Sequence, residues 1–446
     1  MKTTNKRLLA TAVAAALALP TAAFATNGYF SHGYGTTNKG LGGAGVALPQ
    51  DSLAAATNPA GMAFIGERMD VGAALFSPNP RGYTATDAST TAGCQGGQCA
   101  FTLGENGSGQ TLESEDDVFI IPHFGYNWQL DNNSTLGLSV YGNGGMNTEY
   151  KGGQANHNDG TNNNTVNSDG AFGGGTAGVD LEQLFVALTY AQKYSDTGAW
   201  GITPILAYQR FEAKGLNKFG GSSSDSDNLT DNGTDTSSGF GVKLGISDEV
   251  APGLTLGASY QSEMDMSEFD DYKGLFAEQG DFDIPATWTL GLAYDMGDSG
   301  TVLFDVQEIM YGDIASISNP ISNLTVDGNL LGSDDGGGFG WQDITVYKLG
   351  YQWATSADWT WRVGYNHGDQ PIPNTEVLFN ILAPGVMEDH FTFGFTKSTG
   401  ADSEFNFAAM YAPENSVTGE NALNSNQDIT IEMTQWEMEA SWAWKF

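Results

Sequence analysis

The chain ends in WEMEASWAWKF, residues 436–446, and this stretch decides the fold. Every second residue from Trp436 to Phe446 is apolar, whereas Glu437, Glu439 and Lys445 fall on the opposite face. A period of two is that of a β-strand, whose side chains point alternately to its two faces. A strand of a soluble sandwich rarely exposes several tryptophans on one face, so the pattern favours a strand between lipid and a polar interior.

The same alternation recurs from Arg68 onward in segments of ~10 residues, the length of a membrane-spanning strand. It predicts fourteen strands, at residues 68–79, 118–130, 135–148, 181–193, 200–212, 237–248, 253–266, 285–296, 301–312, 343–354, 359–368, 389–397, 403–412 and 434–446. Tight turns alternate with long loops between them, as in outer-membrane barrels. The sequence therefore predicts an all-β protein, with residues 68–446 forming a 14-stranded antiparallel transmembrane β-barrel.

Residues 1–25 have the pattern of a signal peptide, with a basic start, an apolar run and Ala23-Phe24-Ala25 as a cleavage site. No later stretch approaches the ~18 consecutive apolar residues of a membrane-spanning helix. The exported chain is therefore either soluble or a barrel, and the strand pattern places it in the bacterial outer membrane.

The formal net charge is −36, with 17 basic and 53 acidic side chains. This charge argues against nucleic acid or anionic lipid as a partner. Asp225, Asp227 and Asp231 lie in one acidic stretch, but the bidentate Glu of a calcium loop is missing, so a solvated loop is the simpler interpretation. We predict no metal and no cofactor.

The two cysteines, Cys94 and Cys99, stand close together in CQGGQC. In an exported chain they are expected to form a small loop-closing disulfide, since that compartment is oxidising. A zinc site needs two more ligands nearby, and the sequence shows none.

A barrel of fourteen strands has a lumen too wide for its own side chains to fill. Residues 26–67 precede every strand and are rich in Gly and Ala, so we expect them to form an N-terminal hatch folded into the lumen. The alternative is a disordered periplasmic extension. Apolar residues such as Leu41, Val46 and Phe64 favour the hatch, because they provide surface to bury.

The third predicted strand is interrupted by Gly142, Gly144 and Gly145. Glycine inside a strand often marks a bulge, a bend or a close backbone approach. The hatch contains the small-residue turn Asn58-Pro59-Ala60, so the turn and this strand are candidates to touch. An ordinary bulge near the loop end explains the glycines equally well.

Four segments of the chain resemble the FadL/TodX family of outer-membrane transporters for long-chain fatty acids and hydrophobic compounds. They are GLGGAGVALPQDSLAAATNPAGMA, YGNGGMNTEY, WQDITVYKLGYQW and WRVGYNHGDQPIPNTEVLFNILAPGVMEDHFTFGF. The resemblance covers essentially the whole exported chain, and the triplet Asn58-Pro59-Ala60 is its most diagnostic part.

The resemblance implies a fourteen-stranded barrel with a hatch, in which the third strand is kinked and opens a gap in the wall. Gly142, Asn143, Gly144 and Gly145 would then form the kink, and Asn58, Pro59 and Ala60 would face it. Loops would capture ligand beyond the lipopolysaccharide layer, and ligand would leave sideways into the outer-membrane lipid. We expect passive transport, because no ATP or phosphate motif is present. We also expect a monomer.

Two loops carry apolar clusters that are candidates for the capture surface, although they are equally suited to form a rigid cap. The residues are Phe269, Tyr272, Leu275, Phe276 and Phe282 in one loop, and Leu378, Phe379, Ile381 and Leu382 in the other.

A fatty acid needs a cation near its carboxylate. The candidates are Arg210, Lys214, Lys348 and Arg362, with Arg210 and Lys214 preferred. Long-chain fatty acids are the first expectation and hydrocarbons the alternative. An enzyme is not expected, because no Ser/His/Asp motif is present. A nonspecific porin is the remaining rival, and it would have a dispensable N-terminus.

Overall fold

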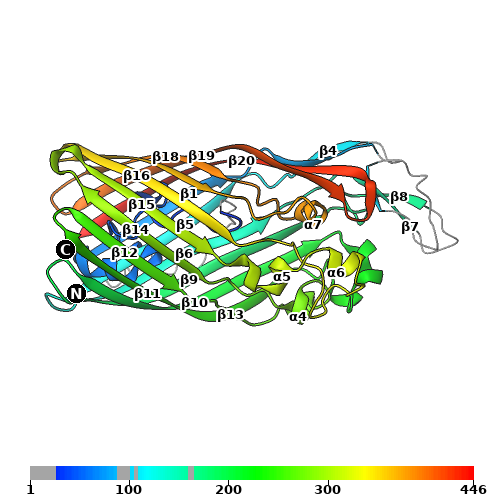
Figure 1. Ribbon diagram of the computed structural model, residues 1–446, viewed down its shortest axis with the longest axis horizontal. Helices are drawn as coiled ribbons and strands as arrows, with labels where there is room; N and C mark the ends of the chain where they lie inside the picture. The colour runs from blue at the N-terminus through cyan, green and yellow to red at the C-terminus, as the bar shows by residue number, and fades with distance from the viewer. Residues whose placement is uncertain (1–26, 88–100, 105–108, 159–164) are drawn as a thin grey trace.

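The structure is a computed structural model that describes residues 27–87, 101–104, 109–158 and 165–446 (Figure 1). The predicted signal peptide and the Cys94–Cys99 pair lie outside these residues, so both stay predictions. The described chain forms an elongated barrel with the C-terminus at one end and most of the short helices at the other.

Fourteen strands close into a ring, which confirms the predicted barrel. They are β1 (Arg68–Ser77), β5 (Phe119–Gln129), β6 (Ser134–Asn147), β9 (Gly178–Lys193), β10 (Ala199–Lys214), β11 (Asp235–Ala251), β12 (Leu254–Gln261), β14 (Thr287–Asp295), β15 (Thr301–Ile309), β16 (Ile344–Ser356), β17 (Trp359–Gly368), β18 (Asp389–Ser398), β19 (Ser403–Asn421) and β20 (Asn424–Lys445). Each pairs antiparallel with the next, and β1 pairs with β20 from Arg68 opposite Lys445 to Ser77 opposite Trp436, which closes the ring.

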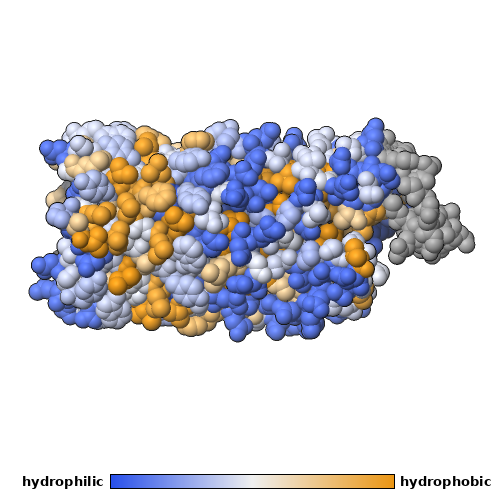
Figure 2. All heavy atoms as spheres, viewed as in Figure 1, coloured by the Kyte–Doolittle hydropathy of each residue, from blue (hydrophilic) through white to orange (hydrophobic). Residues whose placement is uncertain are grey.

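The alternation of β20 orients its two faces as the sequence predicts. Met438 and Trp442 are exposed on the outside, whereas Glu437 and Glu439 are buried on the inside. On the face that Figure 2 shows, hydrophobic residues gather over the half of the barrel that carries the C-terminus in Figure 1. An apolar outer band of this kind is what membrane lipid requires of a barrel wall.

The connections differ in length at the two ends. Short turns join β5 to β6, β9 to β10, β11 to β12, β14 to β15, β16 to β17 and β18 to β19. The other end carries long loops, and hydrophilic residues cover much of its surface (Figure 2). Among the described residues, no helix is long and apolar enough to cross a membrane.

The long loops contain short elements of their own. The strands are β2 (Arg81–Ala85), β3 (Thr102–Leu103), β4 (Gln110–Glu113), β7 (Gln154–Asn158), β8 (Thr165–Asp169) and β13 (Asp265–Met266). The helical turns are η3 (Asn217–Ser222), η4 (Ser226–Asn228), η5 (Asp270–Tyr272), α4 (Ala277–Gly280), η7 (Tyr311–Asp313), α5 (Ala315–Ser318), α6 (Ser322–Thr325) and α7 (Val377–Asn380), and η6 (Gly297–Ser299) lies in a short turn.

The last two strands are longer than predicted, and this is a correction. The sequence pattern predicted that one strand ends at residue 412 and that the next begins at residue 434. In the structure β19 and β20 continue as a hairpin with its turn at Ala422-Leu423. The extension is stabilised because β2 pairs with β20, and Ile429, Ile431 and Met433 are buried.

Residues 27–67, here called the N-terminal segment, lie against the inward side of the wall. The segment contains α2 (Thr36–Lys39), α3 (Ala54–Thr57) and η1 (Pro59–Phe64). Wall glycines allow it to come close: a methyl group added at Gly201 of β10 or Gly245 of β11 would overlap Pro59 or Asn58, and one at Gly364 of β17 would overlap Gly42. Only glycine leaves this space for a second backbone.

Candidate functional site

The N-terminal segment is attached to β20 by buried charge. The Lys39 ammonium lies 2.7 Å from the Glu437 carboxylate and 2.8 Å from that of Glu439, and all three side chains are nearly inaccessible to solvent. The Thr36 hydroxyl also donates to Glu439, over 2.7 Å. Burial alone lowers the pKa of Lys39, but the two carboxylates outweigh it and raise the pKa above its ordinary value.

Wall cations bind the segment elsewhere around the ring. Lys348 of β16 donates to the His32 carbonyl over 3.2 Å. Arg362 of β17 donates to the Gln50 side-chain oxygen over 2.6 and 3.1 Å. Both residues were candidates for binding a ligand carboxylate, and in this structure both are buried and engaged by the N-terminal segment.

The triplet Asn58-Pro59-Ala60 lies beside β10 and β11. The Asn58 amide donates to the Val46 carbonyl over 2.7 Å and to the Ile246 carbonyl of β11 over 3.1 Å, and its oxygen caps the first turn of η1 by accepting from the Ala60 N–H. The triplet was expected to face Gly142–Gly145 on β6, and this expectation is corrected here.

The segment that meets the glycines of β6 is Tyr29–Ser31. The Ser31 N–H donates to the Asn143 carbonyl, and the Gly145 N–H donates to the Tyr29 carbonyl, each over 3.1 Å. A methyl group at Gly144 would overlap the Tyr29 carbonyl. Extended backbone can satisfy the open edge of a strand in this way, whereas the triplet begins a helical turn and cannot.

The wall is incompletely paired at this place. β5 and β6 pair only from Gln129 opposite Thr135 to Phe124 opposite Val140. Beyond Val140, β6 stays paired with β9 but shifts register between Gly142 and Gly144, which leaves Asn143 as a bulge. The wall therefore has a gap between β5 and the part of β6 beyond Val140, here called the β5–β6 seam. Tyr29–Ser31 lies on the edge of β6 that faces this seam.

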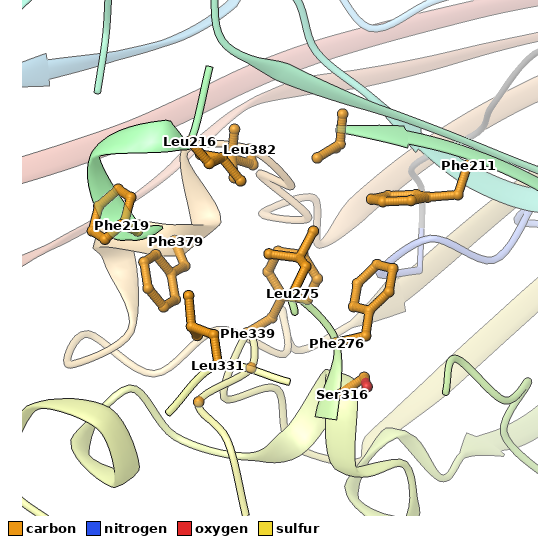
Figure 3. Close-up of a pocket in the computed structure, with 13 residues that line it drawn as sticks. Phe211, Leu216, Phe219, Leu275, Phe276, Ser316, Leu331, Phe339, Phe379 and Leu382 are labelled. Atoms are coloured by element: carbon orange, nitrogen blue, oxygen red, sulfur yellow. The ribbon is translucent and has the colours of Figure 1, made fainter. Parts of the chain in front are cut away.

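An apolar cavity of about 40 Å³ lies among the long loops (Figure 3). The residues labelled in the figure are Phe211, Leu216, Phe219, Leu275, Phe276, Ser316, Leu331, Phe339, Phe379 and Leu382. Figure 3 shows Phe219 and Phe379 on one side of the space and Phe211 and Phe276 on the other. None of the lining residues is charged, and Ser316 has the only polar side chain among them. Apolar concave surfaces of this kind bind hydrophobic molecules.

Of the predicted capture residues, Leu275, Phe276, Phe379 and Leu382 line the cavity. The other five, Phe269, Tyr272, Phe282, Leu378 and Ile381, are buried in the hydrophobic core around it. The sequence analysis missed Phe211, Phe219, Leu331 and Phe339, among others. Phe219 and Phe339 each stand alone between polar residues and glycines, so no cluster of apolar letters marks them.

The two preferred cations are not at the cavity lining. Arg210 lies 3.0 Å from the Glu182 carboxylate, and Lys214 lies 3.3 Å from Glu212. Each cation is thus already balanced by an acid near the outer end of the wall. Among the described residues, no group of three or more His, Cys, Asp or Glu side chains is placed to hold a metal ion.

An acidic pair borders the cavity. Burial and the neighbouring Asp283 carboxylate raise the pKa of Asp281 to about 8. The Asp281 carbonyl accepts a hydrogen bond from Ser316 over 2.5 Å, which connects this pair to the lining.

Residues 11–441 match the model of a family described as outer membrane protein transport protein (OMPP1/FadL/TodX). No curated protein matches the chain at a significant level.

Three solved structures share the fold. The Pseudomonas putida toluene transporter TodX is 17% identical, with a TM-score of 0.65 over 94% of this chain and 100% of that chain. A Pseudomonas aeruginosa FadL homologue is 14% identical, with a TM-score of 0.63 over 94% and 100%. The Ralstonia pickettii toluene transporter TbuX is 15% identical, with a TM-score of 0.60 over 93% and 99%.

Proposed function

The chain belongs to the OMPP1/FadL/TodX family of outer membrane transport proteins, and from that premise we propose that it binds uncharged hydrophobic compounds in the loop cavity and releases them sideways through the β5–β6 seam. Membership makes it an outer-membrane transporter of hydrophobic compounds rather than an enzyme. The compound class, the binding place and the route of release are the proposal.

The cavity lining is the observation that carries the proposal. It joins side chains from four loops and the ends of β9 and β10, and it contains no charged residue. A long-chain fatty acid, the first expectation from the sequence, needs a cation for its carboxylate. Arg210 and Lys214 are paired with acids, and Lys348 and Arg362 hold the N-terminal segment. These facts favour uncharged ligands.

The cavity must widen when it binds. An apolar cavity of ~150 Å³ is large enough for benzene, whereas this one measures about 40 Å³. Leu275 and Phe379 are only half-buried, so their displacement is the easiest way to enlarge the space. We propose that ligand enters past these two side chains.

Release through the seam follows from the solubility of the cargo. Each buried methylene is worth ~0.8 kcal/mol, so a hydrophobic molecule has little reason to cross water toward the periplasm. The N-terminal segment, which we propose acts as a hatch, occupies the straight path through the lumen. Beyond Val140, where β5 and β6 are not paired, we propose that the ligand passes through the wall toward the membrane instead.

The first test is uptake of labelled toluene and oleate by cells that lack their own transporter. A bulky Gly144→Trp variant should overlap the Tyr29 carbonyl beside the seam. We expect it to reduce toluene uptake by obstructing that path. Gly400→Trp, in an exposed turn, is the matched control. Resistance to unfolding by SDS on a gel shows that both variants form barrels. Uptake of oleate alone would contradict the uncharged class, and equal uptake by all variants would contradict the seam.

A second test fills the cavity. Leu331→Trp should weaken toluene binding by about tenfold or more, because even a methylene-sized mismatch in a hydrophobic pocket is worth about 1–3 kcal/mol. Leu331 lines the cavity, whereas its neighbour Leu330 is exposed, so Leu330→Trp is the control. Unchanged affinity in Leu331→Trp would move the binding site elsewhere.

A further inference from the structure

A chain of buried amides runs from the bulge of β6 to the long loop that precedes β14. The Asn143 amide nitrogen donates to the Gln183 oxygen of β9, and the Gln183 nitrogen donates to the Gln209 oxygen of β10, each over 2.9 Å. The Gln209 nitrogen donates to the Phe282 carbonyl, again over 2.9 Å. At the other end, the Tyr34 hydroxyl donates to the Asn143 oxygen over 2.7 Å.

The orientation of the chain is determined from one end. A backbone carbonyl only accepts, so Gln209 must present its nitrogen to Phe282 and its oxygen to Gln183. Gln183 must then present its oxygen to Asn143, whose own oxygen is left to accept from Tyr34. The position of a single loop carbonyl therefore sets the donor direction of every amide as far as the N-terminal segment.

The three amide side chains are buried, so their hydrogen bonds are not exchanged with water. Asn143 and Gln183 are each 1% exposed and Gln209 is fully buried, so water does not replace a lost partner. All six side-chain nitrogen and oxygen atoms of these three residues have a hydrogen-bond partner, which is a neighbouring amide, the Tyr34 hydroxyl or the Phe282 carbonyl. Fully satisfied buried networks of this kind are rigid, and breaking one link leaves its neighbours unpaired.

The two ends of the chain lie at the two parts of the proposed transport route. The Phe282 ring packs 4.8 Å from Phe276, which lines the cavity. Asn143 is the bulged residue at the seam, and its carbonyl accepts from Ser31 of the N-terminal segment. The Tyr34 ring also packs 5.1 Å from Tyr141, on the part of β6 that pairs with β9 but not with β5.

We propose that Gln183 and Gln209 are positioning residues that couple occupancy of the loop cavity to the opening of the β5–β6 seam, an inference that rests on the proposed function. Ligand that displaces Phe276 moves Phe282, and its carbonyl no longer accepts from Gln209. The amides then reorder, and Asn143 loses the contacts that hold the bulge against Tyr34. The seam is thereby loosened only when the cavity is filled.

The test replaces links of the chain while keeping side-chain volume. Gln183→Met and Gln209→Met each remove both amide atoms of one residue and with them two hydrogen bonds, and the double variant removes all three hydrogen bonds between Asn143 and Phe282. Gln261→Met is the matched control, because Gln261 is also buried and inward-facing but its amide nitrogen has no partner. Each variant carries Ile121→Cys on the part of β5 that pairs with β1 but not with β6. Each also carries Cys94→Ser and Cys99→Ser to remove the native cysteines.

Two quantities are measured on each purified protein in lipid bilayers. One is the toluene dissociation constant, and the other is the rate at which a lipid-soluble maleimide labels residue 121 with and without toluene. In the otherwise unchanged chain and in Gln261→Met, toluene should raise the labelling rate. In Gln183→Met and Gln209→Met that rise should shrink about threefold or more, while the dissociation constant stays within about twofold.

The double variant separates coupling from general damage. Residues that act as one unit are not additive, so Gln183→Met combined with Gln209→Met should behave like either single variant. Additive losses, parallel losses of affinity, or a normal toluene response in both single variants would overturn the inference and leave the proposed function standing. If the unchanged chain neither binds nor takes up toluene, the proposed function fails. In that case the inference is tested by the rate at which maleimide labels residue 121 without toluene. This rate must differ between Gln261→Met and the two variants Gln183→Met and Gln209→Met.

Discussion

At the scale of single residues, charge and the absence of a side chain hold the N-terminal segment in place. Lys39 bridges two buried carboxylates of β20. Gly245 leaves room for the Asn58 side chain, and Gly364 leaves room for the Gly42 backbone. The same side chains that looked available for a ligand carboxylate, Lys348 and Arg362, are used for this purpose.

Replacing Lys39 by Met should destabilise the protein, because it leaves Glu437 and Glu439 buried without a cation. We expect a loss of about 3–5 kcal/mol in the free energy of unfolding, measured by urea titration in detergent. Lys445→Met is the control, since its pair with Glu404 is half-exposed and such pairs contribute about 0–1 kcal/mol. Equal losses in the two variants would show that burial of the Lys39 bridge is unimportant.

Replacing Gly245 by Ala should push Asn58 away from β11. Overpacking of this kind costs about 1–3 kcal/mol, whereas Gly220→Ala, whose new methyl group would meet its nearest neighbour at 3.6 Å, should cost little. Thermal unfolding of the two variants in the same detergent checks the difference. A Gly245→Ala protein as stable as the unchanged chain would mean that the N-terminal segment shifts without cost.

At the scale of elements, β6 and the loop before β14 depart from regular structure in ways that serve the site. β6 gives up its pairing with β5 beyond Val140 and gains Tyr29–Ser31 as a substitute partner. The loop before β14 places Leu275 and Phe276 at the cavity, and the same loop carries the acidic pair Asp281 and Asp283.

The acidic pair makes this loop sensitive to pH. Because the pKa of Asp281 rises from 3.8 to about 8 in the folded loop, the folded loop prefers the protonated carboxyl. Its stabilisation is complete below pH 3.8, decreases as the pH rises toward 8, and is absent above that. Hydrogen exchange in residues 265–284, corrected for its intrinsic pH dependence, should therefore accelerate between pH 6 and about 8.

Asp281→Asn should abolish this acceleration, because the amide does not titrate. Asp298→Asn, in an exposed short turn, is the control and should leave it unchanged. Exchange that is independent of pH in the unchanged chain would mean that the Asp281 carboxyl is already ionised in the folded loop.

At the scale of the whole molecule, the ring and the N-terminal segment are interdependent. Fourteen strands enclose more space than their inward side chains fill, and the segment occupies it through contacts with strands on opposite sides of the ring. A porin would have the ring of strands but not these contacts between the ring and an N-terminal segment.

Deleting residues 27–67 should therefore open the lumen. We expect the single-channel conductance in planar bilayers to rise, because the deletion removes the segment whose contacts reach β11, β16 and β20 inside the ring. A high conductance of the full chain, unchanged by the deletion, would favour the porin interpretation instead.

Much of the fold is legible in the sequence, and less of the site. The fourteen strands follow from local alternation, although the extension of β19 and β20 depends on pairing with β2, which no local pattern reveals. Leu275, Phe276, Phe379 and Leu382 could be identified because they interrupt polar loops as clusters. Phe219 and Phe339 could not, because each becomes part of the cavity only when distant loops meet.

The sequence by itself determined the barrel, its outer apolar band and the presence of an interior segment, because period, length and composition are local properties. Tertiary structure alone decided that Tyr29–Ser31 rather than Asn58–Ala60 meets β6, and that Lys348 and Arg362 bind the N-terminal segment. It also decided that Asn143, Gln183 and Gln209 form one chain with Phe282. Such partners lie far apart in the sequence, and only closure of the ring brings them within hydrogen-bonding distance.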